Sequence, residues 1–201
     1  LLLNHSGGLP DWGLLSHDNW RDEILSYQIK ESKPLYSDYS ALRLMLEYEK
    51  KNKKSMQEVC SKVWDKELVF WKDLPEEAQC PPTGFRGGRE ISGVVHDPNA
   101  YTINEFCSHA GLFSTISGIC QTMLNFDKKC DLLRTMKKDM TKRDGQSIFV
   151  NGWDTTTVSE HQRIKKNEAT LAGKGCSVLT FGFLGFTGTS VWMDPEVGKG
   201  H

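Results

Sequence analysis

The stretch that decides the fold is residues 177–193, SVLTFGFLGFTGTSVWM. It is rich in β-branched and aromatic residues, which favour strands, and glycines interrupt it, which favours a turn. The pattern predicts two strands joined by a glycine-rich turn. The most apolar part, from Ser177 to Phe186, is much shorter than the roughly 20 residues that a membrane-spanning helix requires.

Upstream of this stretch the apolar spacing changes to that of helices. After Tyr36, Ser37 and Asp38, apolar residues three and four apart lead into a lysine-rich end at 50–54, which predicts a helix. A second helix is expected from Ser55, and its apolar positions continue as far as Trp64.

This second helix should begin with a capping box, formed by Ser55 and Glu58. Residues 115–126 repeat the helical spacing. The chain is therefore expected to be α+β, with a mainly helical lobe at 39–143 and an antiparallel sheet portion at 177–201.

Two regions lack a periodic pattern. The first 35 residues are predicted to be rich in loops, because glycines and prolines interrupt short apolar pieces. Residues 74–99 are predicted to form one long loop of the functional kind, since proline and glycine recur throughout. At its end, Asp97 and Asn99 are expected to build a turn around His96.

Composition excludes several function classes. The chain has 201 residues, enough for one domain or two small ones, and a formal net charge of −1. A nearly neutral chain does not attract nucleic acid through bulk charge. The segment 127–143 holds seven Lys or Arg, but no aromatic residue interleaves them for base stacking, so a solvated helix face is expected.

The six cysteines show no C-x-x-C pair and no cysteine–histidine spacing typical of zinc sites. Reduced, buried thiols are expected, with no metal and no cofactor. Common catalytic motifs are also missing, including the G-x-S-x-G elbow, the Walker loop and H-E-x-x-H.

Four segments nevertheless form a recognisable series. They are, in chain order, LLLNHSGGLPDWG (1–13), PLYSDYS (34–40), GVVHDPNAYTINEFCSHAGLFST (93–115) and FGFLGFTGTSVWMDPE (181–196). The series resembles the serine β-lactamase-like hydrolases, the group of class C β-lactamases, penicillin-binding carboxypeptidases and related esterases. The resemblance implies a β-lactamase/transpeptidase-like fold, with residues 1–201 as a single partial domain that is incomplete at both ends.

The resemblance also implies roles for individual residues. Tyr36 and Asp38 match the second family motif, whose tyrosine relays protons between nucleophile and leaving group. A phenol with a pKa of ~10 needs nearby cations to act so at neutral pH, and the family's lysines supply them. Gly185, Phe186 and Thr187 match the third motif, whose backbone N–H groups hold the oxyanion of the tetrahedral intermediate.

The chain departs from the family at two places. The third motif normally begins with Lys or His followed by Thr or Ser, whereas this chain has Phe183 and Leu184. Shifting the register to Phe186, Thr187 and Gly188 restores the hydroxyl but not the cation. The nucleophile motif S-x-x-K does not occur, and Thr135-Met-Lys-Lys138 lies on the wrong side of Tyr36 in chain order.

Two functions are therefore consistent with the sequence. The first is a serine hydrolase that acts on a β-lactam, a D-Ala-D-Ala peptide or an ester through an acyl-enzyme, with its nucleophile upstream of Leu1; the 201 residues alone are expected to be inactive. The second is a non-catalytic relative that keeps the cleft for ligand or partner binding. His109 is expected to be a satisfied structural histidine.

Partners and compartment follow from the same considerations. The expected partner is a small-molecule or peptidoglycan-like substrate, with no nucleic acid, no membrane span and no oligomeric state indicated. No leader is visible, so bacterial cytoplasm and periplasm both remain open.

Overall fold

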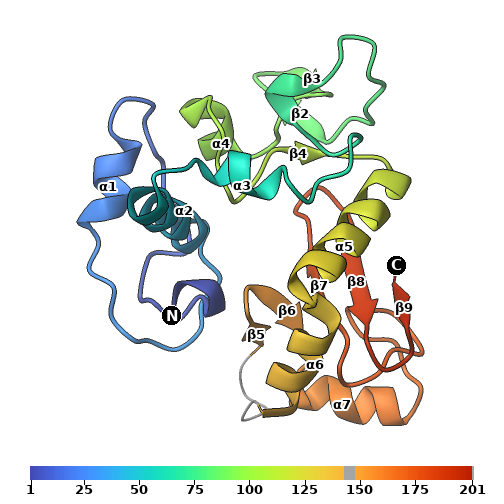
Figure 1. Ribbon diagram of the computed structural model, residues 1–201. Helices are drawn as coiled ribbons and strands as arrows, with labels where there is room; N and C mark the ends of the chain where they lie inside the picture. The colour runs from blue at the N-terminus through green and yellow to red at the C-terminus, as the bar shows by residue number, and fades with distance from the viewer. Residues whose placement is uncertain (143–147, 201) are drawn as a thin grey trace. The chain divides into compact units, whose positions relative to one another are not determined.

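A computed structural model describes residues 1–142 and 148–200 as two compact units. The helical unit comprises residues 9–29 and 36–130. The sheet unit comprises residues 1–8, residues 30–35 and the described chain from Asp131 onward. The described residues form a mixed α/β structure with seven α-helices and antiparallel sheets (Figure 1). The prediction of one partial domain over 1–201 stays a prediction.

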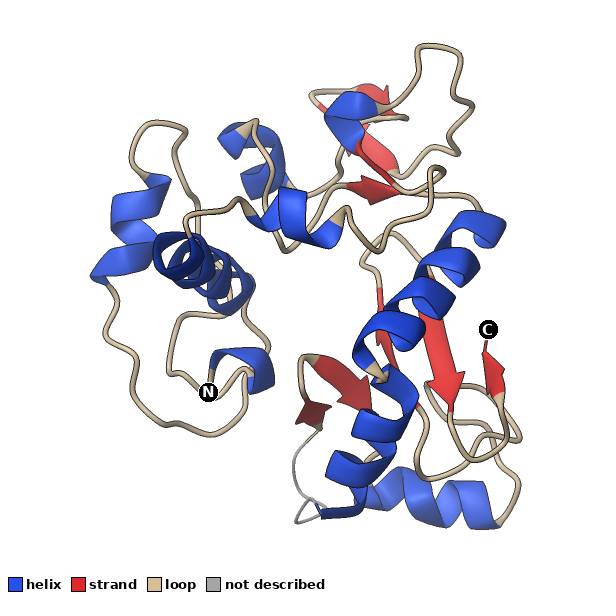
Figure 2. Ribbon diagram, viewed as in Figure 1, coloured by secondary structure: helices blue, strands red, loops and turns tan. Residues whose placement is uncertain are grey.

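The helical unit contains five α-helices and two short antiparallel pairs of strands (Figure 2). Its helices are α1 (Trp20–Ser26), α2 (Asp38–Asn52), α3 (Met56–Cys60), α4 (Pro98–Ile103) and α5 (Ile116–Cys130). Strand β1 (Val69–Phe70) pairs with β4 (Leu112–Phe113), and β2 (Gly84–Arg86) pairs with β3 (Arg89–Ile91). The 3-10 helix η2 (Trp71–Asp73) follows β1.

Helix α2 begins where the sequence predicts. The Ser37 hydroxyl accepts a hydrogen bond from the Ser40 N–H and caps the helix, and Lys53 ends it in the left-handed conformation. One face of α2 is buried and α1 packs against the helix. The predicted helix over this region is confirmed.

Two predictions for the helical unit are wrong. The helix from Ser55 ends at Cys60 rather than continuing to Trp64, and only the Ser55 half of the capping box is present. The region 74–99 is not one loop, because it contains the hairpin β2–β3. Gly87 and Gly88 form its two-residue turn with positive φ values of 57° and 77°, which glycine adopts without strain.

The basic segment divides between two helices. Helix α5 continues to Cys130, Asp131 takes a φ of 53°, and α6 (Leu132–Lys142) follows. Leu132, Met136 and Met140 are buried, whereas Arg134 and the adjacent lysines face solvent. The predicted solvated basic face is thus present on α6; Arg143 lies outside the described residues.

The sheet unit is built on five antiparallel strands in the order β5-β6-β7-β8-β9 (Figure 1). They are β5 (Phe149–Val150), β6 (Trp153–Thr155), β7 (Phe181–Leu184), β8 (Ser190–Asp194) and β9 (Lys199–Gly200). The 3-10 helix η1 (Leu2–Asn4) and α6 contact β5, and α7 (Val158–Lys165) lies between β6 and β7 in the chain. The antiparallel sheet expected at 177–201 is therefore confirmed.

The β7–β8 hairpin requires glycine at position 182, within residues 177–193. Gly182 lies opposite Trp192 in the register. A Cβ at residue 182 would lie 2.1 Å from the Val191 carbonyl oxygen and 2.6 Å from the Trp192 ring. Only glycine fits this close approach of two backbones.

The remaining general predictions concern membranes and thiols. Within the described chain, no helix combines the length and the apolar character that crossing a membrane would require. All six cysteines are free, as expected, but only Cys107 is buried, and Cys120 and Cys130 are exposed.

Candidate functional site

The first part of the candidate site is the start of α2. Ser37 is buried and its hydroxyl donates to the Pro10 carbonyl oxygen at 2.5 Å, which fixes the backbone at this point. Tyr36 and Asp38 flank it. The Tyr36 hydroxyl donates to Asp38 Oδ1 at 2.9 Å, and 42% of Tyr36 remains exposed. The motif thus presents a phenol on a rigid helix end.

The second part is the start of α4. Asp97 is the N-cap of this helix and accepts a hydrogen bond from the Ala100 N–H at 2.7 Å, and Pro98 follows at the first helical position. Asn99 is buried and joins the Gly13 carbonyl oxygen and the Leu15 N–H, at 2.7 and 2.9 Å. The predicted turn at Asp97 and Asn99 is therefore a helix N-terminus.

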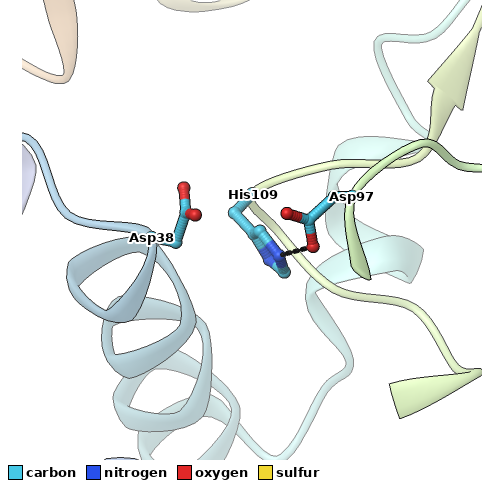
Figure 3. A group of neighbouring side chains, drawn as sticks. All are labelled: Asp38, Asp97 and His109. Carbon is cyan, nitrogen blue, oxygen red and sulfur yellow. Dashed lines mark hydrogen bonds and ion pairs between the residues drawn. The ribbon is translucent and has the colours of Figure 1, made fainter. Parts of the chain in front are cut away.

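His109 joins these two helix ends. Its side chain is 1% exposed, and Nε2 lies 3.0 Å from Asp97 Oδ1. Ligand atoms of Asp38, Asp97 and His109 all lie within 4.8 Å of one another, and Figure 3 shows the three side chains gathered together. We call these three residues the Asp–Asp–His cluster.

His109 is only partly satisfied, contrary to the prediction of a satisfied structural histidine. Its Nδ1 is buried and has no hydrogen-bond partner among the described residues. The Cys107 thiol lies near the ring and favours its protonated form, although Cys107 Sγ is directed to the Ala110 carbonyl oxygen at 3.7 Å.

The charges of the cluster depend on one another. Burial alone would lower the pKa of His109, but the Asp97 hydrogen bond and the Cys107 thiol raise it to about 10. Burial alone would raise the pKa of Asp97, but His109 and the backbone N–H groups of Ala100 and Asn99 lower it. His109 and Asp97 thus form an ion pair at neutral pH.

Asp38 and Tyr36 behave differently from this pair. Burial raises the pKa of Asp38, and His109 and the Tyr36 hydroxyl offset this effect only in part. Burial, followed by the Asp38 carboxylate, raises the pKa of Tyr36 well above its usual value. Within the described residues, burial first and the Asp38 and Asp97 carboxylates next keep the Tyr36 hydroxyl protonated at neutral pH. The role of the family's lysines in lowering this pKa stays a prediction.

The third-motif residues lie in the sheet unit. Gly185, Phe186 and Thr187 are at the tip of the β7–β8 hairpin, not within a strand. The Gly185 N–H donates to the Thr189 carbonyl oxygen at 2.7 Å, and Phe186 is 91% exposed. Tyr36 belongs to the other unit, and the expected roles of Tyr36 and of Gly185, Phe186 and Thr187 stay predictions.

The Asp97–His109 pair and the group that it forms with Asp38 were not predicted from the sequence. One signal for the pair was available, because aspartate followed by proline is typical of a helix N-cap and first turn. No local signal links Asp97 to His109, twelve residues later, or either of them to Asp38.

Comparison with known proteins identifies no relative. No protein-family model matches the chain, no curated protein is significantly similar to it, and no solved structure matches it. The resemblance of the four quoted segments to the β-lactamase-like hydrolases therefore stays a prediction.

Proposed function

We propose that this chain is part of a serine hydrolase of the β-lactamase-like group, with a β-lactamase/transpeptidase-like fold. Its substrate would be a β-lactam, a D-Ala-D-Ala peptide or an ester, and the acylated serine would lie on a segment outside these 201 residues. The observation that carries the proposal is the Tyr36 hydroxyl, which is partly exposed at the N-terminus of α2 and hydrogen-bonded to Asp38.

A proton relay needs a hydroxyl that can both donate and accept near a reacting atom. Tyr36 meets the first need, since it donates to Asp38 and its exposed part can reach a ligand. Its raised pKa makes it a proton donor in this chain. A lysine from the nucleophile segment would lower that pKa and allow Tyr36 to accept a proton as well.

Phe183 and Leu184 favour a second candidate, the non-catalytic relative. Both lie in β7 at the positions where the family carries a cation and a hydroxyl, and Leu184 is exposed. Neither side chain can bind a substrate carboxylate through an ion pair or hydrogen bond. A hydrolase with these two apolar side chains beside its substrate would accept neutral esters better than substrates that carry a carboxylate.

The test begins with the reading frame upstream of Leu1. If it encodes S-x-x-K, the longer protein is expected to be acylated by a fluorescent penicillin or to hydrolyse a neutral ester. The Tyr36→Phe variant should then lose about 100-fold or more in kcat, within the range for a general acid–base group. Tyr48→Phe, within α2, is the matched control and should leave the rate unchanged.

Three results would contradict the proposal. They are an intact upstream frame without S-x-x-K, a Tyr36→Phe variant as active as Tyr48→Phe, and acylation of the 201-residue chain by itself. The first of these would leave the binding protein as the better function.

A further inference from the structure

We infer that Asp38, Asp97 and His109 form a binding site for one divalent transition-metal ion of the Mn²⁺ or Zn²⁺ class. This inference does not depend on the proposed hydrolase, because it concerns three side chains of one compact unit and can be measured without any reaction. Its grounds are the positions of the donor atoms, the local charge and the burial of the His109 ring.

The spacing of the donors suits one ion. Ligands that bind a metal at 2.0–2.2 Å lie roughly 3–4.4 Å apart, depending on the angle between them. The three donor atoms lie within 4.8 Å of one another, and the shortest of these separations given, Asp97 Oδ1 to His109 Nε2, is 3.0 Å. Small rotations of two carboxylates therefore suffice to bring all three onto one ion.

The site is built on rigid elements rather than on a loose surface. Asp38 is in the first turn of α2, directly after the buried cap Ser37, and Asp97 caps α4. The His109 side chain is almost completely buried. Ligands held in this way lose little side-chain freedom when a metal binds.

The charge of the cluster favours a cation. Two carboxylates face one imidazole, and no Lys or Arg of residues 1–142 or 148–200 forms an ion pair with Asp38 or Asp97. The one side-chain hydrogen bond to Asp38 from the described residues comes from the neutral Tyr36 hydroxyl. A divalent ion would balance the second carboxylate, which burial otherwise destabilises.

The imidazole supplies the nitrogen ligand. His109 Nε2 faces Asp97 Oδ1 at 3.0 Å, so Nε2 is the atom that would exchange its proton for the metal and share the ion with Asp97. The ring is held in this orientation by its almost complete burial, and the Cys107 thiol lies near it.

The ligand set selects the class of metal. One imidazole and two carboxylates suit Mn²⁺ and Zn²⁺, whereas Mg²⁺ and Ca²⁺ prefer oxygen ligands alone. Three protein ligands leave at least one position for water or a ligand molecule. Tyr36, 2.9 Å from Asp38 Oδ1 and partly exposed, stands beside the proposed site.

The experiment titrates the chelator-treated chain with MnCl₂, followed by electron paramagnetic resonance, and with ZnCl₂, followed by calorimetry. Mn²⁺ is the main probe because the exposed thiols of Cys120 and Cys130 could bind Zn²⁺. One ion per chain is expected. Asp38→Asn, Asp97→Asn and His109→Gln should each weaken binding at least tenfold, the scale of losses known for metal-site residues.

One variant serves as the matched control. Asp22→Asn removes an exposed carboxylate from α1 and should bind Mn²⁺ as the unchanged chain does. Circular dichroism of each variant shows whether it is folded, and Asn at position 38 or 97 keeps the shape of the side chain, so those two decide the test if His109→Gln unfolds.

The inference is overturned if neither metal binds at millimolar concentration, or if binding is equally strong in the folded Asp38→Asn and Asp97→Asn variants. A loss of binding in Asp22→Asn equal to that in the cluster variants would also overturn it, since binding would then lie elsewhere. None of these results bears on acylation by a penicillin, which tests the proposed hydrolase separately.

Discussion

Asp194 in the sheet unit and Asp97 in the helical unit are both carboxylates with little exposure, but their partners differ. Asp194 accepts five hydrogen bonds, all from neutral donors. These come from the N–H groups of Ser177, Glu196 and Val197 and from the hydroxyls of Ser177 and Thr180, at 2.6–3.1 Å. Its negative charge is stabilised by backbone N–H groups and hydroxyls, which do not change protonation near neutral pH.

Asp97 has the backbone donors of Ala100 and Asn99 and one titratable partner, His109, and Asp38 has a phenol. A carboxylate surrounded by neutral donors holds a fold together and has no capacity left for a ligand. A carboxylate paired with an imidazole or a phenol can still exchange a proton or accept a cation. Asp194 therefore has a structural role, whereas Asp97 and Asp38 remain able to exchange a proton or bind a cation.

The largest effect is expected for Asp194→Ala. The change leaves the buried hydroxyl of Thr180 and the N–H of Ser177 without an acceptor and removes the link between the β8–β9 turn and the segment before β7. Unsatisfied buried donors cost about 1–3 kcal/mol each, so the free energy of unfolding should fall by about 3 kcal/mol or more.

Urea unfolding followed by tryptophan fluorescence measures this loss. Glu196→Ala, which removes an exposed carboxylate two residues away, is the control and should change stability by no more than about 0.5 kcal/mol. An Asp194→Ala variant as stable as the control would mean that the five hydrogen bonds contribute nothing, and the comparison would fail.

A smaller loss of unfolding free energy is expected for substitutions of Asp97. Two substitutions separate the contribution of the helix cap from that of the ion pair with His109. Asp97→Ala removes both the helix cap and the partner of His109, and should cost about 2 kcal/mol. Asp97→Asn keeps a good cap but loses the charge, and should cost about 1 kcal/mol less than Ala. Urea unfolding again gives both values; equal losses would show that the cap contributes nothing beyond the ion pair.

The smallest and most specific effect is a difference in titration, measured by NMR of side-chain carboxyl carbons in metal-free protein. Burial alone would raise the pKa of Asp194, but its donors lower it, whereas burial raises that of Asp38. Relative to an unfolded value of ~3.9, Asp194 should titrate lower and Asp38 higher.

The pKa shifts of Asp194 and Asp38 have opposite signs, so they have opposite effects on how stability depends on pH. Because folding lowers the pKa of Asp194, its contribution is present above about pH 4 and is lost as the pH falls through the folded value. Because folding raises the pKa of Asp38, its ionisation removes stability as the pH rises from about 4 through the folded value. The comparison would be contradicted if both carboxyls titrated on the same side of the unfolded value.

Much of the secondary structure could be predicted from local pattern. Helix α2 follows from apolar spacing and a serine cap, and the β7–β8 hairpin from β-branched and aromatic residues around a glycine-rich turn. The β2–β3 hairpin was also accessible, since Gly87-Gly88 is a typical two-residue turn, but the surrounding prolines concealed it.

The candidate site could be predicted only in part. Tyr36 and Asp38 are two residues apart at a helix N-terminus, and their hydrogen bond is a local feature. His109 was predicted as a satisfied histidine because an isolated histidine in sequence carries no information about its partner. The buried Nδ1 and the Asp97 ion pair depend on the packing of α4 and the chain after it.

The sequence by itself determined the helices and strands whose period, caps and turns are encoded within about ten neighbouring residues, and the solvated basic face of α6. Only the tertiary structure decided which carboxylates became structural and which were paired with titratable groups. The physical reason is that a pKa and an ion pair depend on burial and on atoms a few ångströms away, and residues 38, 97 and 109 become neighbours only when the chain is folded.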